Sequence, residues 1–163
     1  MFNKLFVSIT AQSNRSTMSI VEIARKEIGQ TEKPLNSNKT KYGKWAGLDG
    51  VPWCGLFVSW VYEQAGKPMP RIGFRFNGFA GCQTAVAFFR KNKKIVTQPQ
   101  EGDLVFFDWN GDGRHDHVGI FIRWVDANTI ESIEGNTAIG NDSNGGNVMI
   151  RRRAKRFCLF VRP

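Results

Sequence analysis

The spacing of the apolar residues changes near Gly102, and this change limits what the chain can fold into. Before Gly102, apolar side chains recur at the three- and four-residue intervals of helices. After it, short apolar runs are separated by turn signals at 110–113, 126–128 and 144–146. Helices followed by hairpin-connected strands predict an α+β domain, with N-terminal helices packed on a C-terminal antiparallel sheet of about five to six strands.

Three helices are expected before the strands. The first starts at Ile20, where Ser19 and Glu22 form a capping box, and ends at Gly29. The others cover about 53–64 and 83–89, whereas 31–50 is rich in Asn, Lys and Gly and is expected to be a loop. The expected strands are 104–109, 117–125, 129–136, 148–153 and 157–161.

Length and charge exclude several classes of protein. The 163 residues suit one domain, and no run approaches the roughly 20 apolar residues of a membrane span. A net charge of +9 indicates an anionic partner, for which nucleic acid and bacterial cell wall both qualify. No nucleic-acid-binding motif is present, so we expect no nucleic acid partner. The basic run 151–156 is interpreted as a solvated strand face or as a steering patch.

The first seventeen residues are separated from the rest by the helix signal that begins after Met18. A short apolar patch at 5–7 followed by small residues at 10–13 weakly resembles a secretory signal, but the patch is interrupted. We therefore expect 1–17 to be a flexible arm or an upstream start, not a signal peptide, and 18–163 to be the catalytic domain.

One of the three cysteines stands where a thiol becomes reactive. An odd number of cysteines argues against a disulfide framework, and Cys82 and Cys158 are expected to be buried and inert. Cys54 falls in the first turn of the helix at 53–64, where unpaired N–H groups and the helix dipole favour a thiolate. The alternative is a small buried thiol without chemistry.

A base and an orienting residue follow Cys54 along the chain. His117 heads an apolar strand, and Glu134 and Asn136 share one face of the next strand by the two-residue period. Either of these two could hold the imidazole. The order Cys, His, Glu or Asn on helix, strand and strand is the arrangement of papain-like cysteine hydrolases.

Three segments together resemble the CHAP domains, the cysteine, histidine-dependent amidohydrolases/peptidases. They are Trp53-Cys54-Gly55-Leu56-Phe57-Val58, the strand 102–107 followed by His117-Val118-Gly119-Ile120, and Glu134-Gly135-Asn136. The resemblance covers roughly 20–163 and implies a papain-like (NlpC/P60-CHAP) fold. The related NlpC/P60 hydrolases usually have another histidine as the third polar residue, and here only His115 and His117 exist.

The resemblance implies a hydrolase of bacterial peptidoglycan, acting in the cell wall on the N-acetylmuramoyl-L-alanine bond or within the stem or cross-bridge peptide. A single domain without a wall-binding module suggests a phage-type lysin that is a monomer, and a toxin with an inhibitor protein as partner is a second context. The alternatives are an inactive wall-binding module of the same fold and, third, a basic nucleic-acid binder. The thiol chemistry requires no cofactor.

Aromatic residues near the nucleophile are candidates for contact with substrate. In the family the stretch before the catalytic helix passes close to the cleft, so the resemblance makes Tyr42, Trp45 and Trp53 candidates for stacking on sugar or peptide. Each aromatic side chain also fits the hydrophobic core.

The segment 108–116 matches the first nine positions of a calcium loop. Its metal-ligand candidates are Asp108, Asn110, Asp112 and Asp116. The twelfth position holds Gly119 instead of the bidentate Glu, and the Asn and Gly residues also suit a tight hairpin. Bound Ca²⁺ is thus the alternative to a plain hairpin, and it would fix the strand that carries His117.

Overall fold

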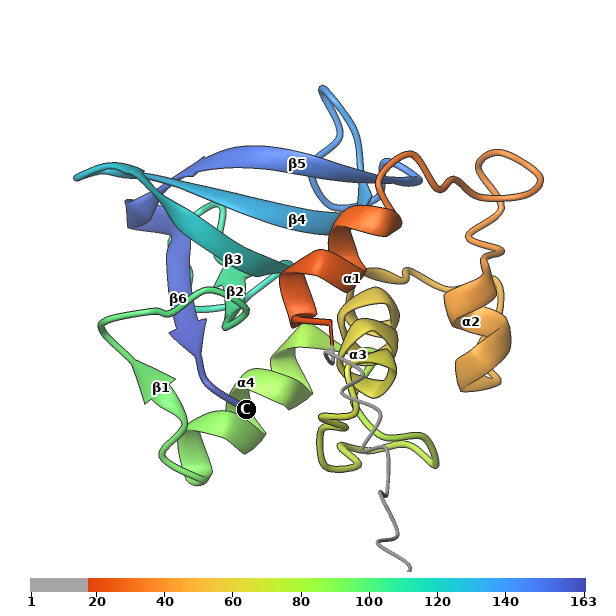
Figure 1. Cartoon of the computed structure of the whole chain (residues 1–163), viewed down its shortest axis with the longest axis horizontal. Coiled ribbons are helices and arrows are strands. Elements are labelled where there is room, and N and C mark those ends of the chain that lie inside the picture. The colour runs from red at the N-terminus through yellow and green to blue at the C-terminus, as the bar shows by residue number, and fades with distance from the viewer. Residues whose placement is uncertain (1–17) are drawn as a thin grey trace, which may run out of the picture.

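The computed structural model describes residues 18–163, so the expected arm at 1–17 lies outside the described residues. Helices come first and strands after them (Figure 1). The helices are α1 (Ile20–Lys26), α2 (Lys41–Ala46), α3 (Cys54–Gln64) and α4 (Cys82–Lys91), with a 3-10 turn at Lys155–Phe157. The strands are β1 (Ile95–Val96), β2 (Leu104–Phe107), β3 (His117–Asp126), β4 (Thr129–Thr137), β5 (Asn147–Ala154) and β6 (Cys158–Val161).

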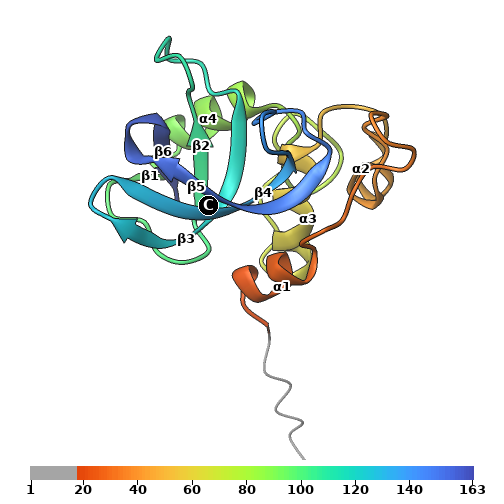
Figure 2. The ribbon, with the colours of Figure 1, turned by 90° about the horizontal axis from the view of Figure 1, so that it is seen from above.

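The strands form one six-stranded sheet in the order β1-β6-β2-β3-β4-β5, and every neighbouring pair is antiparallel. Seen from above, β4 passes beside α3, while β1 and β6 lie at the end of the molecule away from α2 (Figure 2). The predicted α+β class is confirmed. The capping box of Ser19 and Glu22 at the start of α1 is also present.

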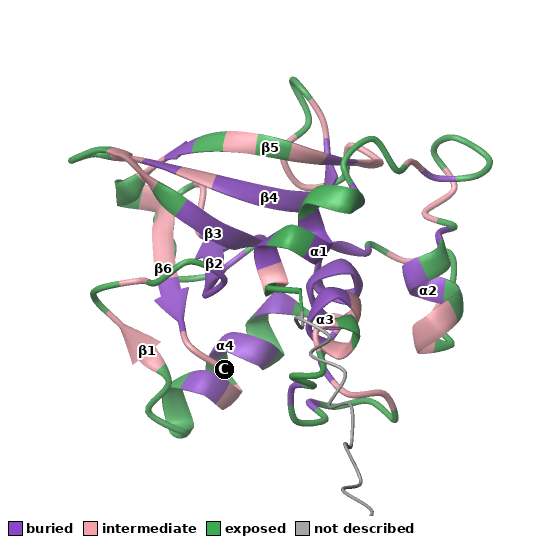
Figure 3. Ribbon diagram, in the orientation of Figure 1, coloured by how far each residue is buried: buried purple, intermediate pink, exposed green. Residues whose placement is uncertain are grey.

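Helix α3 is the central element of the larger core. It contacts β3 and β4 of the sheet and both α1 and α2, and most of its side chains are buried (Figure 3). Leu56, Phe57 and Val61 on this helix are fully buried among apolar side chains of the sheet. Burial of these apolar side chains holds the helix against the sheet, and it therefore also fixes the position of Cys54, the first residue of the helix.

A smaller core lies on the opposite side of the strands. It contains Val105, Phe107, Phe121, Ile130 and Phe160. The register places His117 opposite Phe107, and Glu134 opposite Gly119 two residues further along β3. Side chains of paired residues share a face, so His117 and Glu134 both point to the side of this smaller core.

Two elements of the structure were not predicted. Helix α2 lies inside the segment that was expected to be a loop. It was not predicted because its six residues include Gly43 and only one buried side chain, that of Tyr42. Strand β1 has two residues and depends on its pairing with β6, in which Ile95 faces Val161. Neither has an apolar period long enough to be recognised in the sequence.

Candidate active site

Cys54 is the first residue of α3 and is only 5% exposed. The thiol of Cys82, whose Sγ lies 4.0 Å from the Cys54 Sγ, lowers the pKa of Cys54 by hydrogen bonding. His117 and the backbone N–H of Gly55 lower this pKa further, and together they outweigh the opposing effect of burial. The pKa of Cys54 is therefore well below its ordinary value, which favours the thiolate.

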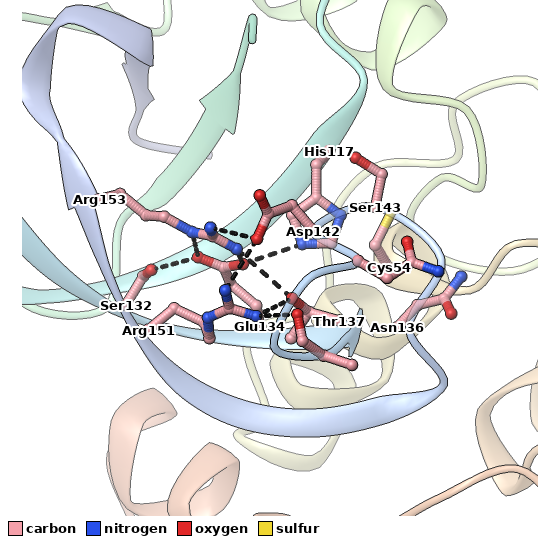
Figure 4. A network of polar contacts seen from close by, with 12 residues as sticks. Cys54, His117, Ser132, Glu134, Asn136, Thr137, Asp142, Ser143, Arg151 and Arg153 are labelled. Atoms are coloured by element: carbon pink, nitrogen blue, oxygen red, sulfur yellow. Dashed lines mark hydrogen bonds and ion pairs between the residues drawn. The ribbon is translucent and has the colours of Figure 1, made fainter.

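The imidazole of His117 lies between Cys54 and Glu134 (Figure 4). Its Nε2 is 3.1 Å from Oε2 of Glu134, while Nδ1 has no hydrogen-bond partner of ordinary geometry among the described residues. Burial alone would lower the pKa of His117. Hydrogen bonding and charge from Cys54 and then Glu134 outweigh burial and raise the pKa to about 9. The two shifts together favour a thiolate beside an imidazolium.

Glu134 is completely buried and accepts hydrogen bonds from three directions. Oε1 accepts from Oγ of Ser132 at 2.6 Å and from Nε of Arg153 at 2.9 Å, and Oε2 accepts from Nη2 of Arg153 at 2.6 Å. Burial would raise the pKa of this carboxyl, but Arg153 and then His117 lower it to about 2. Glu134 is therefore ionised and fixed in orientation.

Arg153 is itself held from its other side. Nη1 donates to Oδ1 of Asp142 at 2.7 Å, and the guanidinium lies 4.8 Å from the ring of Trp109. Trp109 stacks on Phe107 at 4.8 Å, and both rings stack beside His117 at 6.3 and 5.9 Å (Figure 4 shows the polar part of this arrangement). Aromatic rings and ion pairs thus restrict the imidazole and the carboxylate to one arrangement.

A family model described as "CHAP domain" matches residues 46–136, a span that contains Cys54, His117 and Glu134. The chain belongs to the CHAP domain family. A search of the curated proteins finds no match. Membership implies amidase or peptidase activity on peptidoglycan in general, and with it action on the cell wall. Within 18–163 no helix is long and apolar enough to cross a membrane.

Asn136 of this CHAP domain does not contact the imidazole, which corrects the expectation that it could orient His117. Its Nδ2 donates to Oδ1 of Asn144 at 3.1 Å, and its Oδ1 accepts the backbone N–H of Gly146 at 3.2 Å. The backbone of Asn136 is left-handed, with φ of 60°. The two-residue period fails here because the β4–β5 register shifts after Glu134, and the amide serves instead to close the loop between β4 and β5.

Two of the three expected substrate-binding aromatics of the CHAP domain are core residues, which corrects that expectation. Tyr42 is 1% exposed and donates to Glu27, and Trp53 is fully buried and donates from Nε1 to Oε1 of Glu32 at 3.0 Å. Their rings stack on each other at 5.4 Å. Trp45 is half-buried against Phe76, so of these three aromatic residues it is the one with a surface that a ligand can reach.

The expected calcium loop connects β2 and β3 of the CHAP domain and is held by hydrogen bonds between its side chains and its own backbone. Oδ1 and Oδ2 of Asp108 accept the backbone N–H groups of Gly111 at 2.7 Å and Gly113 at 2.8 Å, and Asp112 accepts that of Arg114. Among residues 18–163, no three His, Cys, Asp or Glu side chains converge to hold a metal ion. The Asn110 amide and backbone carbonyls are also ligands of the kind that Ca²⁺ binds, so a calcium site at Asp108, Asn110, Asp112 and Asp116 stays a prediction.

The residues that sequence reasoning missed are those that support the reactive groups. Arg153 was placed in a solvated or steering run, yet it is 7% exposed and paired with Glu134, and Arg151 reaches Asp142 at 2.8 Å. The available signal was the two-residue period of β5, which alternates Arg151 and Arg153 with the exposed Arg152. Nothing in the sequence pairs Cys82 with Cys54.

Proposed function

We propose that the chain hydrolyses an amide bond of peptidoglycan by nucleophilic catalysis. In this proposal Cys54 is the nucleophile, His117 is the general acid and base, and Glu134 orients His117. The observation that supports it most is the position of the His117 imidazole between the Cys54 thiol and a buried, ionised Glu134. A buried charge set of this kind is costly to fold and is typical of catalytic sites.

The reaction begins with attack of the Cys54 thiolate on the amide carbonyl carbon. The tetrahedral intermediate collapses when the His117 imidazolium donates a proton to the leaving amine, and a thioester remains. His117, now neutral, takes a proton from water, which attacks the thioester and releases the acid and the Cys54 thiolate. Glu134 keeps the imidazole in one orientation through both steps.

The oxyanion of the intermediate needs hydrogen-bond donors at the start of α3. The first N–H groups of a helix have no partner within the helix, so the backbone N–H of Cys54 is available beside the reacting sulfur. Each donor of this type typically contributes about 3 kcal/mol to the transition state. Trp53 provides no side-chain cap that would compete for these groups.

The substrate bond is the N-acetylmuramoyl-L-alanine amide or a peptide bond in the stem or cross-bridge. We propose a phage-type lysin, acting as a monomer with 18–163 as its catalytic domain; a toxin held by an inhibitor protein is the second context. The net charge of +9 favours association with an anionic wall. Mass spectrometry of a digest of defined peptidoglycan would identify the bond from the new amino termini.

The two other functions lack support of this kind. An inactive wall-binding module would not need a thiol of lowered pKa beside an imidazole that a carboxylate orients, so the directions of these pKa shifts support hydrolysis instead. A nucleic-acid binder would show affinity for DNA that falls steeply with salt. Salt-sensitive DNA binding without any release of wall fragments would favour that function over hydrolysis.

Removal of the nucleophile tests the proposal. Cys54→Ala and Cys54→Ser are each expected to reduce turbidity clearing of purified cell walls to background, because neither side chain supplies a thiolate. Cys158→Ser, which changes a thiol in β6 outside the site, is the matched control and should clear walls normally. Circular dichroism checks that all three variants are folded. Undiminished clearing by either Cys54 variant would exclude the proposed mechanism.

A further inference from the structure

The N-termini of two helices meet at the proposed nucleophile. Cys54 is the first residue of α3 and Cys82 is the first residue of α4, and their Sγ atoms are 4.0 Å apart. No disulfide joins them, and the two residues are 5% and 8% exposed. The proposed chemistry uses Cys54 and leaves the function of the second thiol open.

The backbone around the two thiols is packed closely enough to hold them together. A Cβ atom at Gly55 would lie 2.6 Å from the carbonyl oxygen of Ala80, so the segment before α4 rests directly on the start of α3. The Ser59 hydroxyl on α3 accepts the backbone N–H of Phe79 at 3.0 Å and donates to the Gly55 carbonyl at 2.7 Å. These contacts join the segment just before Cys82 to the part of α3 just after Cys54.

We propose that Cys54 and Cys82 are a redox modification site, in which a hydroperoxide converts the two thiols into a disulfide that blocks hydrolysis until a dithiol reduces it. A reactive thiolate with a second thiol next to it is the arrangement of redox-sensing cysteines. The sulfurs are 4.0 Å apart, and this separation must shorten to about 2.05 Å in a disulfide.

Two steps balance the oxidation. First, the Cys54 thiolate attacks the outer oxygen of the hydroperoxide, and with one proton this gives a sulfenic acid and an alcohol, or water when the oxidant is hydrogen peroxide. Second, the Cys82 thiol attacks the sulfenic sulfur, which forms the S–S bond and releases water. A dithiol restores both thiols and is itself oxidised to a disulfide.

The third cysteine is not suited to this reaction. The thiol of Cys158 donates to the backbone carbonyl of Ala154 at 3.4 Å, and burial raises its pKa to about 12. It stays protonated at neutral pH and does not compete for the oxidant. Hydrogen-bonded pairing of Cys82 with Cys54 keeps the resolving thiol protonated as well, since burial and the neighbouring thiolate raise the pKa of Cys82.

The test uses the full chain, reduced, freed of reductant and treated with a small excess of hydrogen peroxide. Trypsin cuts at Arg71 and Arg75, between the two cysteines, so a disulfide appears as two linked peptides that separate on reduction. We expect free thiols to fall from three to one per chain, with Cys54 linked to Cys82. Cys54 found only as sulfinic or sulfonic acid, or linked to Cys158, would overturn the proposal.

Variants separate the resolving thiol from simple oxidation of the nucleophile. In Cys82→Ser the sulfenic acid has no neighbouring thiol, so continued exposure to peroxide oxidises it further to sulfinic acid. We therefore expect a loss of wall clearing that dithiothreitol does not restore, because a dithiol reduces a disulfide or a sulfenic acid but not a sulfinic acid. The wild type and Cys158→Ser should lose clearing and regain it on reduction, each relative to its own untreated sample. Equal recovery in Cys82→Ser and the wild type would contradict the proposal.

The disulfide measurement does not depend on hydrolysis, so its result is separate from that of the proposed function. A Cys54–Cys82 disulfide in a protein that never clears walls would support the redox site and reject the hydrolase. Wall clearing that Cys54 variants abolish, together with no linked peptide after oxidation, would support the hydrolase and reject the redox site.

Discussion

A single buried carboxylate contributes to the charge state of the candidate site. Glu134 lies between two cations, His117 and Arg153, and has no contact with water. A carboxylate in such a place is stable only while its partners neutralise it. Its charge in turn helps to keep His117 protonated up to a pKa of about 9, which is the form that donates a proton to the leaving amine.

Glu134→Gln tests this dependence. The amide keeps the shape of the side chain but removes the charge that raises the pKa of His117, so imidazolium is lost at lower pH. We expect the alkaline limb of the profile of kcat/KM against pH to move below about 9, and activity at neutral pH to fall by about 10²-fold or more. The measurement is the release of wall fragments over a series of buffers.

The same substitution removes the buried one of the two carboxylates that pair with Arg153, and this by itself costs folding stability although Asp142 remains. The double variant Glu134→Gln/Arg153→Met also removes the buried guanidinium and so separates the loss of stability from the change in the pKa of His117. If the double variant regains stability but keeps the shifted alkaline limb, the charge of Glu134 sets the pKa of His117. An alkaline limb that stays at its wild-type position in both variants contradicts this role.

At the scale of elements, glycines allow strands β3 and β4 to approach what they must contact. A Cβ at Gly119 would lie 2.7 Å from Cγ of Glu134, and one at Gly135 would lie 2.7 Å from Phe57 of α3. The first glycine gives the carboxylate room to reach His117 two residues earlier on β3. The second lets β4 lie against the helix that carries Cys54.

Gly119→Ala is expected to displace Glu134, because Arg153 and Ser132 hold that side chain and it cannot move away freely. Crowding of this kind typically costs 1–3 kcal/mol, and we expect wall clearing to fall by about tenfold or more. Gly81→Ala is the control, since the nearest atom to its new Cβ is 3.8 Å away. Normal clearing by Gly119→Ala in a folded protein would show that Glu134 does not need this position.

The helices and strands differ in how well they could be predicted from the sequence. Helix α3 and the strands β2 to β6 were predictable, because each has an apolar period or run bounded by Gly, Asn or Pro. Helix α2 and strand β1 were not, because tertiary contacts form them. Tyr42 anchors α2 through its stacking on Trp53 and its hydrogen bond to Glu27.

At the scale of the whole molecule, the site contributes to stability in a way that depends on pH. The folded pKa of Glu134 is about 2, below the ordinary 4.5, so its contribution is complete above 4.5 and is lost as the pH falls through about 2. That of His117 is raised from 6.5 to about 9, so its contribution is complete below 6.5 and is lost as the pH rises through about 9.

We therefore expect the free energy of unfolding, measured by urea titration, to fall by about 3 kcal/mol through Glu134 as the pH decreases from 4.5 toward 2. The comparison is with Glu134→Gln/Arg153→Met, which has no carboxyl to protonate at this position and should lose correspondingly less over the same range. Equal losses in the two proteins would mean that the site contributes nothing to acid stability.

The sequence was sufficient for the reacting groups and insufficient for what surrounds them. Cys54, His117 and Glu134 stand in short motifs whose spacing relates to helix and strand geometry, so each could be proposed from local pattern. Asn136 was proposed by the same period, which a register shift in the sheet cancels. Arg153 and Trp109 reach the site through the register of the sheet, and Cys82 reaches it because the segment before α4 lies against the start of α3. No local pattern in the sequence records these distances.

The shielding of Cys54 has a consequence for turnover. Only 5% of Cys54 is exposed, so a bulky wall polymer reaches its sulfur less easily than a small reagent does. We therefore expect side chains beside Cys54 to move before its sulfur attacks a wall amide. A small alkylating agent should reach the thiol without this movement. The rate of thiol alkylation and the rate of wall digestion would then measure two different barriers.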